Sequence, residues 1–244
     1  VYRLTQQAVT NFTAAQSGYK DDRLWPVILI AQELHDDASA VPLGKTHSVL
    51  FNTRSTDWQA PNDVPLLFNA QCGCLCRVVY KGGVPAALKA AVSSGNLSAA
   101  DRLGLLGDAV FSFQAGLTTF AEFMDVLVLY AHETSLPVLS TLSYAVADLL
   151  DMHRAHPSLG ALKAKLRDAF APLYIAVNGW EFTPDASDPR MLQKRGVVIG
   201  MMLSLGHSGA HHAGADVAHA LINANAPLIA AYVEKYGVDA PCVC

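Results

Sequence analysis

The hydrophobic pattern changes its period near Lys81-Gly82-Gly83, and this change constrains the fold more than any other feature of the sequence. Before it, short apolar runs rich in β-branched residues stand between turn residues, at 25–30, 45–54, 64–69 and 75–80. Runs of this kind predict strands of an antiparallel sheet, and the polar stretch 31–43 predicts a loop. After it, apolar residues follow a helical period. The sequence therefore predicts a β-sandwich unit over 1–82, incomplete at its N-terminus, and a helical domain over 83–244, incomplete at its C-terminus.

Capping residues predict where the helices begin and end. Ser98 precedes Asp101 by three residues, as in an N-cap, and Thr119 precedes Glu122 by three, as in a capping box. The other boundary signals are Gly116 at the end of the first helix, Ser158 at the start of another, Pro189 and Gly206 around a fourth, and Pro227 and Gly237 around a last one. Short connections favour antiparallel helix pairs stacked side by side. A helical-repeat arc fits this pattern as well as a closed bundle does.

Composition excludes several classes of protein. Hydrophobic residues make up 52% of the 244 residues and charged residues 16%, which excludes a disordered chain. The net charge of −4, with no Lys/Arg stripe, argues against nucleic-acid binding. No run reaches the roughly 18 uninterrupted apolar residues of a membrane span. The five cysteines lie in two tight groups, which is a poor disulfide framework, so we expect a reducing compartment and predict a cytoplasmic location.

Two clusters contain residue types that bind metals. His207 and His211 would share a face if their segment were helical, and Cys72, Cys74 and Cys76 would direct three thiols to one face of a strand. The histidines lack a complete ligand set, and structural zinc sites favour CxxC pairs. We interpret the histidines as polar loop residues and the cysteines as small, partly buried ones. The sequence predicts no catalytic residue, metal site or cofactor site in this chain.

Several motifs in collinear order resemble those of M1-family zinc aminopeptidases. Asp101-Arg102 opens a stretch that continues through Asp108 to Glu133 and resembles the DR…DA…NET signature at the start of that family's helical domain. Upstream, Asn69 with Arg77 to Tyr80 resembles the strand that closes its β-sandwich. This sequence departs from the family pattern at Cys74, Leu75, Cys76 and His132, and it has Gly104 and Gly107 where better helix formers are expected.

The resemblance, which is to the puromycin-sensitive and endoplasmic-reticulum aminopeptidases, implies an α+β, mainly α, fold. A partial antiparallel β-sandwich would precede a HEAT-like, right-handed superhelical domain. It also implies a parent enzyme that removes N-terminal amino acids from peptides, with zinc held by an HExxH motif in a catalytic domain before Val1. The nearest sequence here, residues 132–136, ends in Leu136 where the second histidine would stand, so it lacks a zinc ligand.

We therefore expect a non-catalytic portion that caps the catalytic domain of the same chain and shapes access for peptide substrates. The alternative is a catalytically inactive relative that serves as a binding scaffold. The motif residues are expected to be structural: Asn69, Arg77, Tyr80, Asp101, Arg102, Asp108 and Glu133. Asp101, Arg102 and Asp108 suggest an interdomain ion-pair set, although Asp101 also fits a simple charge at a helix N-terminus.

Overall fold

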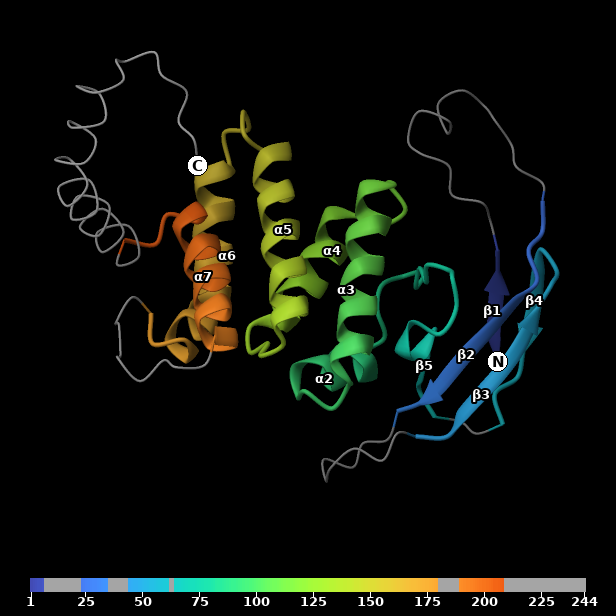
Figure 1. Ribbon diagram of the computed structural model, residues 1–244. Helices are drawn as coiled ribbons and strands as arrows, with labels where there is room; N and C mark the ends of the chain where they lie inside the picture. The colour runs from blue at the N-terminus through green and yellow to red at the C-terminus, as the bar shows by residue number, and fades with distance from the viewer. Residues whose placement is uncertain (7–22, 35–43, 62–63, 180–188, 209–244) are drawn as a thin grey trace, which may run out of the picture.

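The computed structural model describes residues 1–6, 23–34, 44–61, 64–179 and 189–208 (Figure 1). Two small antiparallel sheets come first along the chain. In one, β1 (Tyr2–Thr5) pairs with β4 (Ser55–Trp58). In the other, the strand order is β3 (Thr46–Phe51), β2 (Val27–Glu33) and β5 (Leu66–Phe68). The prediction of antiparallel strands in the first part of the chain is therefore confirmed.

The two sheets pack against each other through alternate residues of their strands. Leu29, Ala31 and Val49 are buried on one face of the three-stranded sheet, with Phe68 beside them. The ring of Phe68 meets Tyr2 of β1 at a centroid distance of 5.3 Å and Trp58 of β4 at 6.1 Å. Side chains that alternate along a strand point to opposite faces, which is why every second residue enters this core. The arrangement is two small antiparallel sheets with a shared core.

The helices follow in a row beside the sheets (Figure 1). They are α2 (Ala86–Ser93), α3 (Ala99–Gln114), α4 (Phe120–Leu127), α5 (Leu136–Met152), α6 (Leu159–Ala176) and α7 (Pro189–Ser204), with a 3₁₀ turn, η2 (Val128–Tyr130), after α4. Helix α5 packs against both α3 and α7, α4 packs against α3, and α6 packs against α7. Leu106, Leu142, Leu166 and Met202 lie in one continuous core without exposed surface. The chain has an α+β fold in which helices predominate.

The capping predictions for α3 and α4 are confirmed, and α6 begins after the expected Ser158, although Ser158 makes no side-chain cap bond. The Ser98 hydroxyl accepts the N–H of Asp101, and Thr119 and Glu122 form a reciprocal capping box. Gly116 follows α3 with φ 68°, a left-handed conformation that glycine adopts without steric cost. Helix α7 begins at the expected Pro189 and ends at Ser204, close to the expected boundary.

The predicted strand over residues 75–80 is wrong. The chain makes a tight turn at Leu75, where the N–H of Cys76 donates to the carbonyl oxygen of Cys74 at 2.8 Å. The N–H of Val78 then donates to the carboxylate of Asp108 on α3 instead of to a neighbouring strand. The expectation that three alternating thiols share one strand face fails with it. The side chain of Asp108 on α3 accepts the backbone hydrogen bond that Val78 would otherwise donate to a neighbouring strand.

One boundary and three further elements differ from the prediction. Strand β2 continues to Glu33, into the predicted loop, because Glu33 pairs with Leu66 of β5. Strand β4 and helices α2 and α5 carried no recognised signal. The rest of the predicted loop, the predicted last helix and His211 lie outside the described residues. Within the described residues, no helix combines the length and apolar character needed to cross a membrane.

Candidate functional site: the junction of sheets and helices

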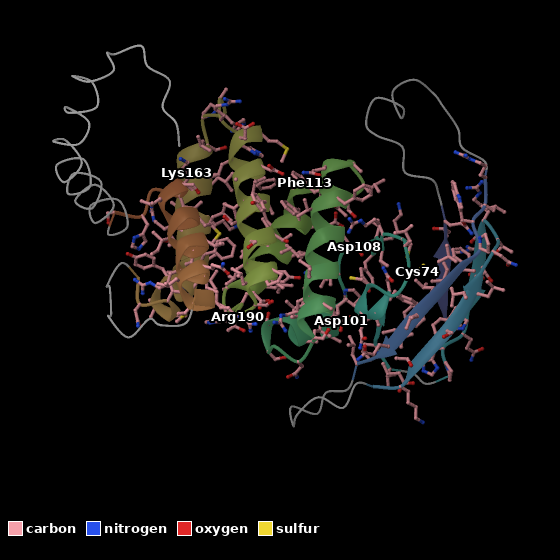
Figure 2. The ribbon with its side chains drawn as sticks, in the orientation of Figure 1. Cys74, Asp101, Asp108, Phe113, Lys163 and Arg190 are labelled. Carbon is pink, nitrogen blue, oxygen red and sulfur yellow. The ribbon has the colours of Figure 1, made fainter. Side chains whose placement is uncertain are left out.

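Helix α3 faces the segment that links the sheets to the helices, residues 69–80 (Figure 2). Asp101 and Asp108 both point from α3 toward this segment, and both are buried. They are seven residues apart, which is about two turns or 10 Å along the helix axis. One helix face therefore presents two carboxylates to a loop.

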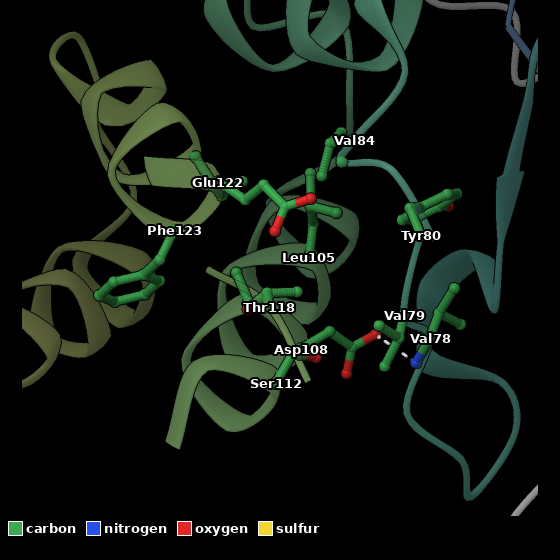
Figure 3. A pocket seen from close by; sticks show the side chains of 13 residues that line it. Val78, Val79, Tyr80, Val84, Leu105, Asp108, Ser112, Thr118, Glu122 and Phe123 are labelled. Atoms are coloured by element: carbon green, nitrogen blue, oxygen red, sulfur yellow. Dashed lines mark hydrogen bonds between the residues drawn. The ribbon is translucent and has the colours of Figure 1, made fainter. Parts of the chain in front are cut away.

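Each carboxylate accepts a backbone N–H from the loop. Asp101 accepts the N–H of Gln71 at 2.5 Å and the hydroxyl of Ser98 at 2.6 Å. Asp108 accepts the N–H of Val78 at 3.0 Å, drawn in Figure 3, and the guanidinium of Arg77 at 3.2 Å. Burial raises the pKa of Asp108 above its ordinary value, although Val78 and Arg77 act in the opposite direction. Asp101 is thus an acidic residue in the first turn of α3, as one sequence interpretation expected, and it holds the loop by a hydrogen bond and not by an ion pair.

Glycines in α3 let the loop approach closely. A Cβ atom on Gly104 would lie 2.7 Å from the Sγ of Cys72, and one on Gly107 would lie 3.2 Å from the Nη1 of Arg77. Both positions lie between the two carboxylates. Each glycine lowers helix propensity by up to about 1 kcal/mol. Both stand where the side chains of Cys72 and Arg77 come close to the backbone of α3.

Gly104→Ala is expected to lower the free energy of unfolding by about 1–3 kcal/mol, since the new methyl group overpacks against Cys72. Gly200→Ala in α7 is the matched control, because no described atom outside its own helix turn lies within 4 Å of its Cβ position. There the gain in helix propensity should stabilise the protein by about 0.5–1 kcal/mol. Urea denaturation followed by circular dichroism measures both. If Gly104→Ala stabilises the protein as Gly200→Ala does, the contact with Cys72 does not exclude a methyl group at position 104. In a Cys72→Ala background, Gly104→Ala should no longer destabilise the protein.

Asn69 and Tyr80 hold the two ends of the linking segment. The side-chain oxygen of Asn69 accepts the N–H of Cys74 at 2.8 Å, and its side-chain nitrogen donates to the carbonyl of Cys76 at 3.2 Å. The hydroxyl of Tyr80 accepts the N–H of Phe68, the last residue of β5, at 3.2 Å. Burial raises the pKa of Tyr80, so its hydroxyl stays protonated at physiological pH.

Arg102 and Glu133 join α3 to the start of α5. Their side chains form a two-pronged ion pair, with Nε–Oε2 at 2.6 Å and Nη2–Oε1 at 2.8 Å. Glu133 Oε1 also accepts the N–H groups of Thr134 and Ser135, each at 2.7 Å. The Tyr130 hydroxyl donates to the backbone carbonyl of Arg102 at 2.8 Å. Glu133 therefore holds the backbone of the two residues just before α5, where Ser135 makes no side-chain cap.

The Glu133 carboxylate should make stability depend on pH in the acid range. Burial opposes its ionisation, but Arg102 and the two backbone N–H groups outweigh burial and lower the pKa below its ordinary 4.5. The folded state thus favours the charged form, and the resulting stability is present above 4.5 and is lost as the pH falls through the lowered pKa. We expect the stability difference between wild type and Glu133→Gln to shrink as the pH falls from about 7 to 3. Urea titrations at stepped pH test this, and a constant difference would contradict it.

The described residues do not fit a zinc site. His132 and Glu133 lie in the turn before α5, not on a helix, and both oxygens of Glu133 already accept hydrogen bonds. His207 follows the end of α7, and its ring meets that of Tyr174 at 4.3 Å. In this part of the chain, no three His, Cys, Asp or Glu side chains gather as metal ligands do.

A small pocket of ≈ 30 Å³ lies where the linking segment meets α3 and α4 (Figure 3). Val78, Tyr80, Asp108, Thr118 and Glu122 are among its lining residues, and the Thr118 hydroxyl has no hydrogen-bond partner among the described residues. This volume is on the order of one water molecule.

The model of the ERAP1-like C-terminal domain family matches residues 65–232, more than half of the chain. The chain belongs to this family. The ERAP1-like domain is also 27% identical over 168 residues to Aminopeptidase M1-A of Oryza sativa subsp. japonica, an alignment that covers 65% of this chain and 19% of the relative. The two matches identify the chain as a C-terminal region of the M1 aminopeptidase type, a family of metalloprotease hydrolases. The chain spans about a fifth of the relative's length, 19%.

The matched range contains every motif residue singled out from the sequence. In the ERAP1-like domain these residues form two neighbouring groups on α3. Asp101 and Asp108 bind the linking segment that contains Asn69, Arg77 and Tyr80, and Arg102 binds Glu133 before α5. Sequence reasoning missed the roles of Tyr130 and of Gly104 and Gly107. The two glycines were a visible signal, because they interrupt an otherwise well-capped helix at positions three residues apart.

Proposed function

We propose that this chain is a non-catalytic part of a cytoplasmic zinc aminopeptidase, and that its helices cap the catalytic domain and limit which peptides reach it. Zinc would be held in that domain, by residues other than 1–244. The observation that carries the proposal is the junction. Asp101 and Asp108 accept backbone hydrogen bonds from the linking segment, and the Arg102–Glu133 ion pair joins α3 to the start of α5. A cap that selects substrates by size needs its helices held in a fixed orientation.

The packing of the helices supports an extended, HEAT-like right-handed arrangement as part of the same proposal. Helices α3, α5 and α7 lie in sequence along one layer, and α4 and α6 pack against members of it. Repeated addition of such pairs builds a superhelix with a long concave face. A face of this kind would contact the distal part of a peptide whose N-terminus lies at the catalytic centre.

The test uses the full-length parent protein with zinc. Hydrolysis of a one-residue fluorogenic aminoacyl reporter is compared with hydrolysis of peptides of increasing length. Asp101→Ala/Asp108→Ala, assayed below its unfolding temperature, should change kcat/KM for long peptides several-fold and leave the reporter unchanged. Lys89→Ala, which breaks the surface pair with Asp125, is the matched control and should alter neither. Equal changes for reporter and peptides would contradict the access role. Peptide binding without turnover by the zinc-loaded parent would instead support a scaffold.

A further inference from the structure

Three thiols lie within residues 72–76, and they have different surroundings. The Sγ of Cys72 is directed at α3 and lies 3.7 Å from the carbonyl oxygen of Ala100. Cys74 and Cys76 are both half-buried and lie on either side of Leu75 in one tight turn. The cluster is therefore one separate thiol and one pair two residues apart.

The backbone holds this pair together in a three-residue turn. The hydrogen bond from the N–H of Cys76 to the carbonyl of Cys74, at 2.8 Å, closes a γ-turn around Leu75. Leu75 at its apex is fully exposed, with a relative accessibility of 105%. Asn69 fixes both ends, since its amide binds the N–H of Cys74 and the carbonyl of Cys76. A disulfide requires Cα atoms within about 4.4–6.8 Å, and a folded turn brings residues two apart well inside the upper limit.

We infer that Cys74 and Cys76 form a reversible disulfide within this turn, which makes the turn a thiol–disulfide exchange site. The inference is independent of the proposed peptidase role. The oxidant of the two thiols would be a low-molecular-weight disulfide. Oxidised glutathione represents this class in the experiment below.

The exchange proceeds in two balanced steps. The thiolate of Cys74 attacks one sulfur of oxidised glutathione, an S–S bond to the protein forms, and one glutathione leaves as thiolate. That thiolate takes the proton of Cys76, whose Sγ then attacks the Sγ of Cys74 and displaces the second glutathione. Two protein thiols are oxidised, and one glutathione disulfide is reduced to two glutathione molecules.

The electrostatics assign the order of the two cysteines. Burial raises the pKa of Cys76 to about 12, and the neighbouring Cys74 and Asp108 act in the same direction. Cys76 is therefore protonated at physiological pH and does not attack first. Once Cys74 carries glutathione it has no negative charge, so one of the causes that raise the pKa of Cys76 is removed. Cys74 is the attacking thiol and Cys76 the resolving one.

The experiment equilibrates the full chain in glutathione buffers of stepped reduction potential, in a Cys242→Ser/Cys244→Ser background. After acid quenching and alkylation, mass spectrometry of the peptide that contains residues 69–80 counts free thiols, internal disulfide and bound glutathione. Wild type should convert to the internal disulfide in one step, and Cys72→Ser should do so at the same potential. Cys76→Ser should stop with glutathione on Cys74.

Asn69→Gly tests whether the turn causes the reaction. Asn69 has φ 56°, which glycine also adopts, so this change removes the amide and keeps the backbone. The equilibrium constant for disulfide formation should fall at least threefold. Two outcomes overturn the inference: a wild-type pair that remains as thiols or takes up two glutathiones in every buffer, and an Asn69→Gly variant that oxidises as readily as wild type. Circular dichroism of each variant confirms that the helices remain folded.

Discussion

Replacing Glu133 with alanine is expected to lower the free energy of unfolding by about 3–5 kcal/mol. The side chains of Arg102 and Glu133 are only 13% and 1% exposed, so the change leaves a nearly buried guanidinium without its counter-charge. It also removes the acceptor for two N–H groups at the start of α5. Urea denaturation monitored by circular dichroism at neutral pH measures the loss.

Two further variants separate charge from hydrogen bonding. Glu133→Gln keeps an oxygen for the α5 amides and should cost less than Glu133→Ala. Arg102→Met combined with Glu133→Leu removes both charges, and its cost should be smaller than the sum of the two single losses. A Glu133→Ala variant within about 1 kcal/mol of wild type would mean that Arg102 finds water or another partner, contrary to the structure.

The double change Asp101→Ala/Asp108→Ala should release the linking segment from α3. Each carboxylate satisfies a loop N–H, and an unsatisfied buried donor costs about 1–3 kcal/mol. The two sites are about 10 Å apart along α3, so their losses should be nearly additive and total about 2–6 kcal/mol. Urea denaturation gives the energy, and the rate of limited proteolysis within residues 69–80 reports on the loop itself.

Asparagine at the same positions is the control. Asp101→Asn and Asp108→Asn keep an oxygen acceptor, so each should be less destabilising than alanine. Asp108→Asn has the additional advantage of removing a carboxylate whose pKa is raised by burial. Equal proteolysis rates for wild type and the double alanine variant would show that the loop does not depend on the two carboxylates.

The sequence predicted those parts of the fold that depend on neighbouring residues. The starts of α3 and α4 were found because Ser98 and Thr119 bond to residues three positions along the chain. Helix α5 was missed because its capping carboxylate belongs to Glu133, whose position is fixed by Arg102 on another helix. Residues 75–80 have the composition of a strand, but Asp108 accepts the hydrogen bond of Val78. No pattern within the segment itself reveals that acceptor.

For the candidate site, the sequence predicted the residues but not their partners. Family resemblance located Asp101, Arg102, Asp108 and Glu133, but their partners follow only from the tertiary structure. Asp108 binds Arg77, 31 positions away, and Arg102 binds Glu133, also 31 positions away. Charge and helical spacing suggested ion pairs without indicating which residues they join. The turn that brings Cys74 and Cys76 to either side of Leu75 was also hidden, because it replaced the expected strand.

Three residues of the linking segment that are not glycine have left-handed backbones: Asn69, Gln71 and Cys72, with φ of 56°, 55° and 52°. An L-residue adopts this conformation at a cost of roughly 1 kcal/mol, so an unfolded chain rarely adopts all three together. Helix α3 has its own caps and can form early, whereas the segment gains its hydrogen bonds only after α3 presents both carboxylates. The transition state for folding should therefore contain α3 and lack the docked segment. Substitutions that weaken the bonds between α3 and the linking segment would then accelerate unfolding and leave the folding rate almost unaltered. The linking segment therefore sets the lifetime of the folded state.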